Sequence, residues 1–135
     1  MKDLSVYITE NQNKKEFIII KPEFLDCKND ILEFLKNHKI IPVRELQKTL
    51  TLSEAKKLYK VHAKEKFYDD LCKYMSESDS IGIILCNYGD DDMLKLKDTI
   101  REKWGKDEMR NAIHSSDSGV NVYRESKIYF ATPMI

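Results

Sequence analysis

Apolar and polar positions along the chain predict strands separated by helical segments. Residues 17–21 begin with the β-favouring run Phe-Ile-Ile-Ile and end before Pro22, which predicts a buried central strand. Residues 80–88 contain a similar apolar run and predict a second buried strand. Residues 40–50 predict a strand that a proline interrupts, and residues 127–130 predict the last strand.

Apolar residues at helical spacing predict helices in the segments between these strands. Asn29 or Asp30 can cap the first helix, and Thr51 followed by Glu54 marks the start of the second. Acidic residues crowd the start of the helix that precedes Gly105, and this glycine is expected to end it. The predicted helices cover residues 29–38, 53–62, 65–75, 90–104 and, as a short element, 117–125.

The resulting order is the βαββαβ pattern of an α+β, ferredoxin-like antiparallel sheet with helices on one face. The 135 residues suit a single domain with one core, which we expect to span residues 14–135. Residues 1–13 are polar and irregular, and we expect a flexible N-terminal arm or a short extra strand there. Because this fold carries many unrelated functions, it predicts none by itself.

Composition and charge narrow the class of protein. With 41% hydrophobic and 34% charged residues, the chain is typical of a folded globular protein rather than a disordered or membrane protein. Its 23 basic and 23 acidic residues balance, so no global charge favours nucleic acid or an anionic membrane. The sequence shows no run that could span a bilayer and no signal-peptide pattern, so we expect a cytoplasmic protein with no membrane partner.

The candidate chemistry lies in residues 110–118, which read RNAIHSSDS. They place one histidine, His114, among small hydroxyl residues just before a predicted helix start. Such a segment suits anions, because free N–H groups and the helix dipole favour negative charge. A neutral imidazole there can attack phosphorus and hold a phosphoryl group covalently. Taken alone, a histidine in this setting is more often a polar surface residue, so both interpretations stay open at this point.

The same stretch resembles the active-site signature of the nucleoside diphosphate kinase family, Asn-x-x-His-(Gly or Ala)-Ser-Asp. Glu125 follows His114 at the family's spacing, and the resemblance runs from about Phe17 to Phe130. Several motifs in the family's order make the match specific. The other matching stretches are IIIKP at 18–22, LYKVHAKEKFYDDLCKYM at 58–75 and TIREKWGKDEMRNAIH at 99–114.

The resemblance implies an enzyme that transfers the γ-phosphate of a nucleoside triphosphate, ATP, to a nucleoside diphosphate. His114 would carry the phosphoryl group, and Glu125 would accept a hydrogen bond from the other imidazole nitrogen and so fix the tautomer. Asn111 would hold the ribose hydroxyl. The six positions implied to bind the nucleotide are Lys21, Tyr59, Phe67, Leu71, Arg101 and Asn111.

The other implied contacts divide between the phosphates and the base. Lys21 would contact the ribose hydroxyl or a phosphate, and Arg101 would support the phosphates with its planar fork. Tyr59 would lie beside the transferred phosphate, while Phe67 would stack on the base with Leu71 packed nearby. The alternative for the last three residues is ordinary core packing, and for Lys21 it is the solvent end of a strand.

The resemblance also implies Mg²⁺ bound through the nucleotide's phosphates, and no protein cluster here has the spacing of metal ligands. Members of the family have a long excursion of the chain before the position of Thr99. That excursion is largely missing here, because Asn87 leads almost directly into Thr99. The arginine and threonine of that excursion have no counterpart, with only Lys95, Lys97 and Lys103 as substitutes.

The missing excursion bears on activity and assembly. It leaves open an alternative function, a catalytically weak or inactive nucleotide-binding or regulatory module with the same fold. Because the excursion also packs subunits together in the family, we expect no hexamer here, which leaves a smaller homo-oligomer or a monomer. The expected partners are nucleoside di- and triphosphates, without nucleic acid.

Overall fold

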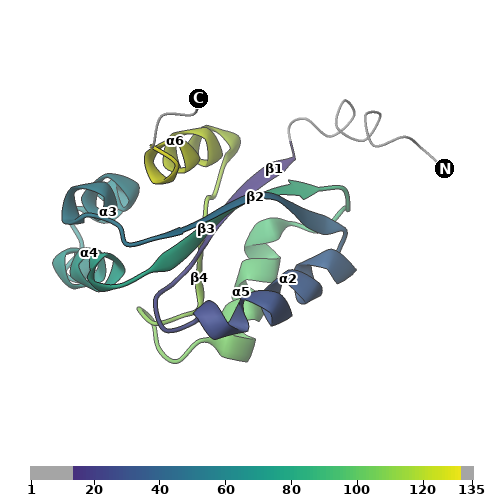
Figure 1. Cartoon of the computed structure of the whole chain (residues 1–135), viewed down its shortest axis with the longest axis horizontal. Helices are drawn as coiled ribbons and strands as arrows, with labels where there is room; N and C mark the ends of the chain where they lie inside the picture. The colour runs from purple at the N-terminus through teal and green to yellow at the C-terminus, as the bar shows by residue number, and fades with distance from the viewer. Residues whose placement is uncertain (1–13, 132–135) are drawn as a thin grey trace.

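The chain folds around a four-stranded antiparallel sheet, and the computed structural model describes residues 14–131 of it (Figure 1). The spatial order β2-β3-β1-β4 is that of a ferredoxin-like sheet, which confirms the predicted fold class. The arm expected at residues 1–13 lies outside the described residues. The strands are β1 (Lys15–Ile20), β2 (Ile40–Lys48), β3 (Ser80–Asn87) and β4 (Ile113–Ser115).

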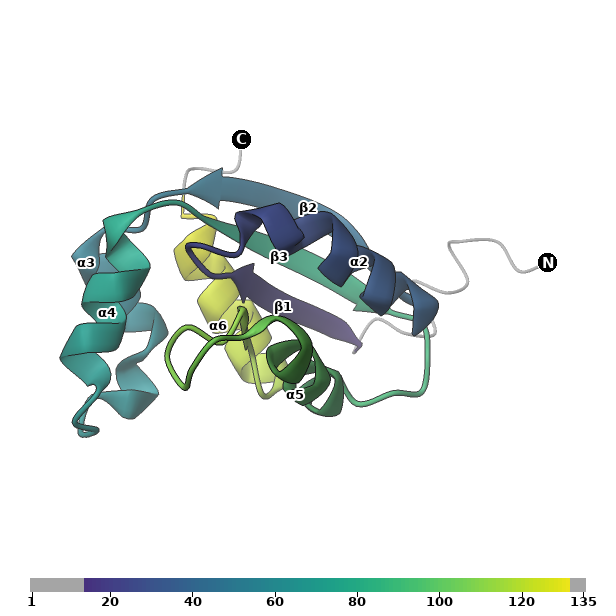
Figure 2. The same cartoon turned by 90° about the horizontal axis from the view of Figure 1, so that it is seen from below.

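Helices cover both faces of the sheet, not one face as the sequence pattern indicated. Figure 2 shows α2 and α5 on one side, while Figure 1 shows α3, α4 and α6 on the other. The helices are α2 (Lys28–Asn37), α3 (Leu52–Leu58), α4 (Tyr68–Glu77), α5 (Met93–Trp104) and α6 (Gly119–Tyr129).

The second helical layer follows from the residues of β1, which are apolar on both faces. Ile18 and Ile20 pack into a core with α2 and α5, whereas Phe17 and Ile19 pack into a second core with α3, α4 and α6. All four side chains are completely buried. A strand that is apolar on both faces needs a helical layer on each, because either face would otherwise expose apolar surface to water.

The last strand is β4, and the prediction of a strand at residues 127–130 is wrong. Residues up to Tyr129 continue α6, which begins after Ser118, whose hydroxyl accepts a hydrogen bond from the Asn121 N–H at 3.1 Å. Tyr129 then packs into the second core, and its hydroxyl lies 2.9 Å from Ser80 Oγ. The strand-like composition of this segment is overridden by tertiary packing. Residues 113–115, expected to be loop, pair with β1 instead.

Some predicted helix ends are confirmed and others move. Thr51 forms a capping box with Glu54 at the start of α3, as expected. The first helix, α2, begins at Lys28, because a preceding 3-10 helix, Leu25–Cys27, leads directly into it, and neither Asn29 nor Asp30 caps it. The helical pair is shorter than predicted, since α3 ends at Leu58 and α4 starts at Tyr68.

Two other expectations concern backbone breaks. The predicted irregularity in β2 is confirmed, because its register against β3 shifts between Pro42 and Arg44. Gly105 ends α5 as predicted, but with extended backbone rather than a left-handed turn. A Cβ at this position would lie 2.5 Å from the Arg101 carbonyl oxygen, so lack of space explains the glycine.

Within residues 14–131, no helix has the length and apolar character needed to cross a bilayer.

Gly82 is the position where the second core tolerates no added atom. It lies on β3 opposite Ile19, and a Cβ there would stand within 3.0 Å of the Tyr129 ring. We expect Gly82→Ala to lower the free energy of unfolding by about 1–3 kcal/mol, as overpacking does. Urea unfolding measures this. Gly119→Ala is the control, because its Cβ would meet nothing within 4 Å. Equal stability of both variants would contradict this account.

Candidate active site

Strand β4 places His114 in the sheet beside β1, where it pairs with Ile19. Side chains alternate along a strand, so His114 faces the second core, whereas its neighbours Ile113 and Ser115 face the other side. Ala112, just before the strand, has a positive φ of 79°, an uncommon conformation for a residue with a Cβ. Strained backbone of this kind concentrates at functional sites, and here it turns the chain into β4.

A buried carboxylate holds the His114 ring. Glu125 on α6 accepts a short hydrogen bond at its Oε1 from His114 Nε2. The side chains are 15% exposed for His114 and 5% for Glu125. Ser116 Oγ donates to the same Oε1 at 2.8 Å, and Arg124 Nη2 donates to Oε2 at 3.2 Å. These partners offset the cost of burying the carboxylate.

The pairing determines which ring nitrogen can react. With Nε2 engaged by Glu125, a neutral His114 keeps its proton on Nε2 and its lone pair on Nδ1. No residue among 14–131 forms a hydrogen bond to Nδ1. Burial lowers the pKa of His114, Glu125 raises it, and the positive charges of Lys21 and Arg101 lower it again. The net decrease favours the neutral, nucleophilic imidazole.

Tyr59 forms one wall of the site. Its ring meets the His114 ring edge to face, with centroids 5.1 Å apart and planes at 73°. The residue is 3% exposed, and its hydroxyl has no hydrogen-bond partner among the described residues. Burial, together with the nearby Glu125, raises the pKa of Tyr59 well above its usual range, so the hydroxyl remains a donor.

Two cations lie close to the histidine. Lys21 is 3% exposed and its Nζ donates to the Met109 carbonyl at 3.1 Å. Burial, together with the nearby charge of Arg101, lowers the pKa of Lys21 to about 7, although Asp107 opposes the shift. Arg101 donates from Nε and Nη2 to the Ile113 carbonyl, at 3.1 and 3.0 Å. Arg101, and Lys21 when it is protonated, thus place positive charge beside His114, without an acidic ion-pair partner among residues 14–131.

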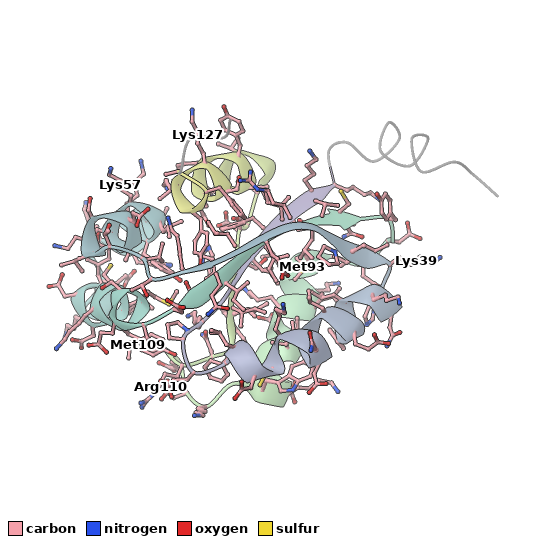
Figure 3. The ribbon with its side chains drawn as sticks, in the orientation of Figure 1. Lys39, Lys57, Met93, Met109, Arg110 and Lys127 are labelled. Atoms are coloured by element: carbon pink, nitrogen blue, oxygen red, sulfur yellow. The ribbon has the colours of Figure 1, made fainter. Side chains whose placement is uncertain are left out.

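Asn111 belongs to the loop that joins α5 to β4. Its Nδ2 donates to the Glu108 carbonyl at 2.8 Å, but its Oδ1 is buried without a partner among the described residues. Figure 3 labels Met109 and Arg110 in the same loop, below α4 in that view. Within residues 14–131, Asn111 and Tyr59 carry the two buried side-chain atoms that lack a hydrogen bond. Such atoms are rare in native proteins.

The two residues implied to bind the base lie differently from each other. Phe67 is 44% exposed at the start of α4, with its ring 5.3 Å from that of His62. Leu71 is buried in the second core, so its main role is packing. The structure therefore brings together His114 and Glu125 with Tyr59, Lys21 and Arg101. Neither Phe67 nor Leu71 forms a ring contact or hydrogen bond with this group among the described residues.

The lysines considered as substitutes for the missing excursion do not join the site. Lys103 lies over the Phe34 and Trp104 rings, and Lys97 pairs with Asp98 at 3.6 Å. Among residues 14–131, none of Lys95, Lys97 and Lys103 has a hydrogen bond, ion pair or ring contact with His114. The described part of the chain, residues 14–131, contains no group of three histidine, cysteine or acidic side chains that could hold a metal ion.

Arg124 is the residue that the sequence did not single out. An arginine on a helix next to a glutamate is common, and only the fold shows that its guanidinium contacts Glu125. Ser116, one of the small hydroxyl residues that follow His114, donates a hydrogen bond to the same carboxylate.

Known proteins match the chain over nearly its whole length. The family model described as nucleoside diphosphate kinase matches residues 14–135. A nucleoside diphosphate kinase of Fervidobacterium nodosum is 31% identical over 133 residues, covering 87% of this chain and 89% of the relative. One of Hyperthermus butylicus is 28% identical over 132 residues, covering 87% and 92%.

Solved structures show the same fold. An orthorhombic crystal form of the Aquifex aeolicus nucleoside diphosphate kinase aligns with a TM-score of 0.75 at 22% identity, covering 88% of this chain and 96% of that one. A nucleoside diphosphate kinase family protein from Babesia bovis aligns with a TM-score of 0.71 at 19% identity, covering 87% and 88%.

The buried Lys21 predicts a pH-dependent stability. Its pKa is about 7 in the folded protein and 10.5 normally, so between these values the unfolded chain binds a proton that the folded chain does not. Stability of the parent therefore rises with pH over this range. Lys21→Met removes the titration, so the variant should be the more stable by several kcal/mol at about pH 6, with each pKa unit worth about 1.4 kcal/mol.

That advantage should shrink as the pH increases above about 7, and urea unfolding across the range measures it. Lys127→Met, at an exposed position on α6, is the control for the loss of a lysine side chain. A constant difference for Lys21→Met would contradict the low pKa.

Proposed function

The chain belongs to the nucleoside diphosphate kinase family, and from this premise we propose that it moves the γ-phosphate of ATP to a nucleoside diphosphate through a phosphohistidine on His114. The family's members are phosphotransferases. The observation that carries the proposal is the hydrogen bond between Glu125 and His114 Nε2, which leaves the Nδ1 lone pair free for attack.

In the first half-reaction, the Nδ1 lone pair attacks the γ-phosphorus as the bond to the β-phosphate oxygen breaks, and the nucleoside diphosphate leaves. The ring gains positive charge, which the carboxylate of Glu125 stabilises through the Nε2 proton. In the second half-reaction, a terminal oxygen of the acceptor attacks the same phosphorus. The nitrogen–phosphorus bond breaks, and neutral His114 is restored.

The surrounding groups would hold the nucleotide in place for this transfer. Lys21 and Arg101 would balance phosphate charge, because both are cations beside His114. The unpartnered Tyr59 hydroxyl would donate to the transferred phosphate, and the unpartnered Asn111 Oδ1 would accept from a ribose hydroxyl. The exposed ring of Phe67 would stack on the base.

Mg²⁺ would be held by the nucleotide's phosphates. It would neutralise part of the phosphate charge.

The alternative of a weakly active or inactive binding module is not favoured, because the relatives reported above are named as kinases. The short connection between β3 and α5, residues 88–92, supports the proposal that no hexamer forms. Light scattering that gave the mass of a hexamer would contradict it. A cytoplasmic location remains a prediction from the sequence.

Phosphorylation by γ-labelled ATP and Mg²⁺ tests the proposal. We expect an acid-labile, alkali-stable label that discharges onto added GDP and is lost in His114→Ala. Glu125→Gln should keep the label but slow its formation about 10- to 100-fold, the loss that follows when the carboxylate partner of a metal-bound histidine is disturbed.

His38→Ala is the matched control, because His38 also pairs with a carboxylate, Asp91, at 2.8 Å, but at the end of α2 against the β3–α5 connection. This variant should label normally. Two results would overturn the proposed transfer. One is a label that persists in His114→Ala, and the other is a parent protein that binds nucleotide but acquires no label.

A further inference from the structure

The guanidinium of Arg124 uses all three of its nitrogens within the protein. Nε donates to Asn121 Oδ1 at 3.2 Å, Nη1 to the Lys57 carbonyl at 2.9 Å, and Nη2 to Glu125 Oε2 at 3.2 Å. Only 23% of the side chain is exposed. A planar fork that makes three bonds has a fixed position, unlike an arginine solvated on a helix surface.

One of these bonds ties α6 to α3. The Lys57 carbonyl lies in the last turn of α3, where a cation is favoured because carbonyls there lack helical partners. The two helices are neighbours on the same face of the sheet, and Figure 3 labels Lys57 on α3. Tyr59 follows two residues later, and its ring contacts His114. Arg124 therefore fixes the end of α3 that carries one wall of the site.

A second bond orients the carboxylate. Glu125 divides its oxygens, with Oε1 on His114 and Ser116 and Oε2 on Arg124. Because Oε2 is held, rotation of the carboxylate would break the Arg124 bond, so Oε1 stays directed at Nε2. Asn121, which accepts from Arg124 Nε, is itself held by Asp117 at 2.6 Å.

We infer that Arg124 is a positioning residue for the phosphoryl transfer proposed above, on which this inference rests. It acts through Glu125 and the end of α3, and it keeps the His114 ring turned with Nδ1 toward the nucleotide side and the proton on Nε2. It touches neither the imidazole nor, in this account, the nucleotide.

A double-mutant cycle tests whether Arg124 acts through Glu125. We expect Arg124→Ala to lower kcat about tenfold, the lower end of the loss that follows when outer hydrogen-bond partners at metal-bound histidines are removed, with little change in KM. In a Glu125→Gln background the same change should have little further effect. Arg124→Met, which keeps the apolar stem, replaces the alanine variant if that variant fails to fold.

Lys127→Ala is the matched control, since it removes one positive charge from an exposed position on the same helix, and it should leave kcat unchanged. An equal loss from Arg124→Ala in both backgrounds would overturn the inference, because the arginine would then act independently of Glu125.

A readout without turnover separates this inference from the kinase proposal. Nitrogen-15 NMR of His114 should show one tautomer, with the proton on Nε2, in the parent and in Lys127→Ala, and a mixture of tautomers in Arg124→Ala. An unchanged tautomer in folded Arg124→Ala would overturn the positioning role. A parent protein that showed the Nε2–H tautomer and its loss in the variant, yet never became phosphorylated, would contradict the kinase proposal alone.

Discussion

The buried hydrogen bond between Glu125 and His114 is the interaction on which the rest of the site depends. It joins the shortest strand, β4, to the last helix, α6, and so requires both elements to be in place. A carboxylate this deeply buried is stable only with donors around it, which Ser116 and Arg124 supply. The same bond fixes which ring nitrogen keeps a lone pair. One side-chain contact therefore both links β4 to α6 and determines which nitrogen of His114 can react.

The two-faced sheet explains how the remaining groups reach the histidine. His114 faces the layer of α3, α4 and α6, where Tyr59 closes one side of its ring. The two cations come from other elements. Lys21 directly follows the end of β1, and Arg101 extends from α5 on the opposite face to the Ile113 carbonyl. The positive charges of Arg101 and of protonated Lys21 lower the pKa of His114. Within residues 14–131, the Tyr59 hydroxyl and Asn111 Oδ1 are buried without a hydrogen-bond partner, which is rare in native proteins.

The sequence predicted the long elements well and the short ones poorly. Apolar runs located β1 and β3, and the Thr51–Glu54 capping box marked α3, because these signals are local. Strand β4 has only three residues, one of them His114, and exists through pairing with β1, which no local pattern records. Residues 127–129 have strand-like composition but follow the helix because Tyr129 fills the space above Gly82. The resemblance to the family identified Glu125, whereas Arg124 became visible only through its contacts in the fold.

The most direct test of the account is to identify which nitrogen of His114 carries the phosphate. The protein labelled with nitrogen-15 would be phosphorylated by ATP and examined by NMR for coupling between phosphorus and each ring nitrogen. The account predicts coupling to Nδ1 alone, with the proton retained on Nε2 beside Glu125. Phosphate on Nε2, or on a residue other than His114, would contradict it, because the contact with Glu125 would then not direct the reaction.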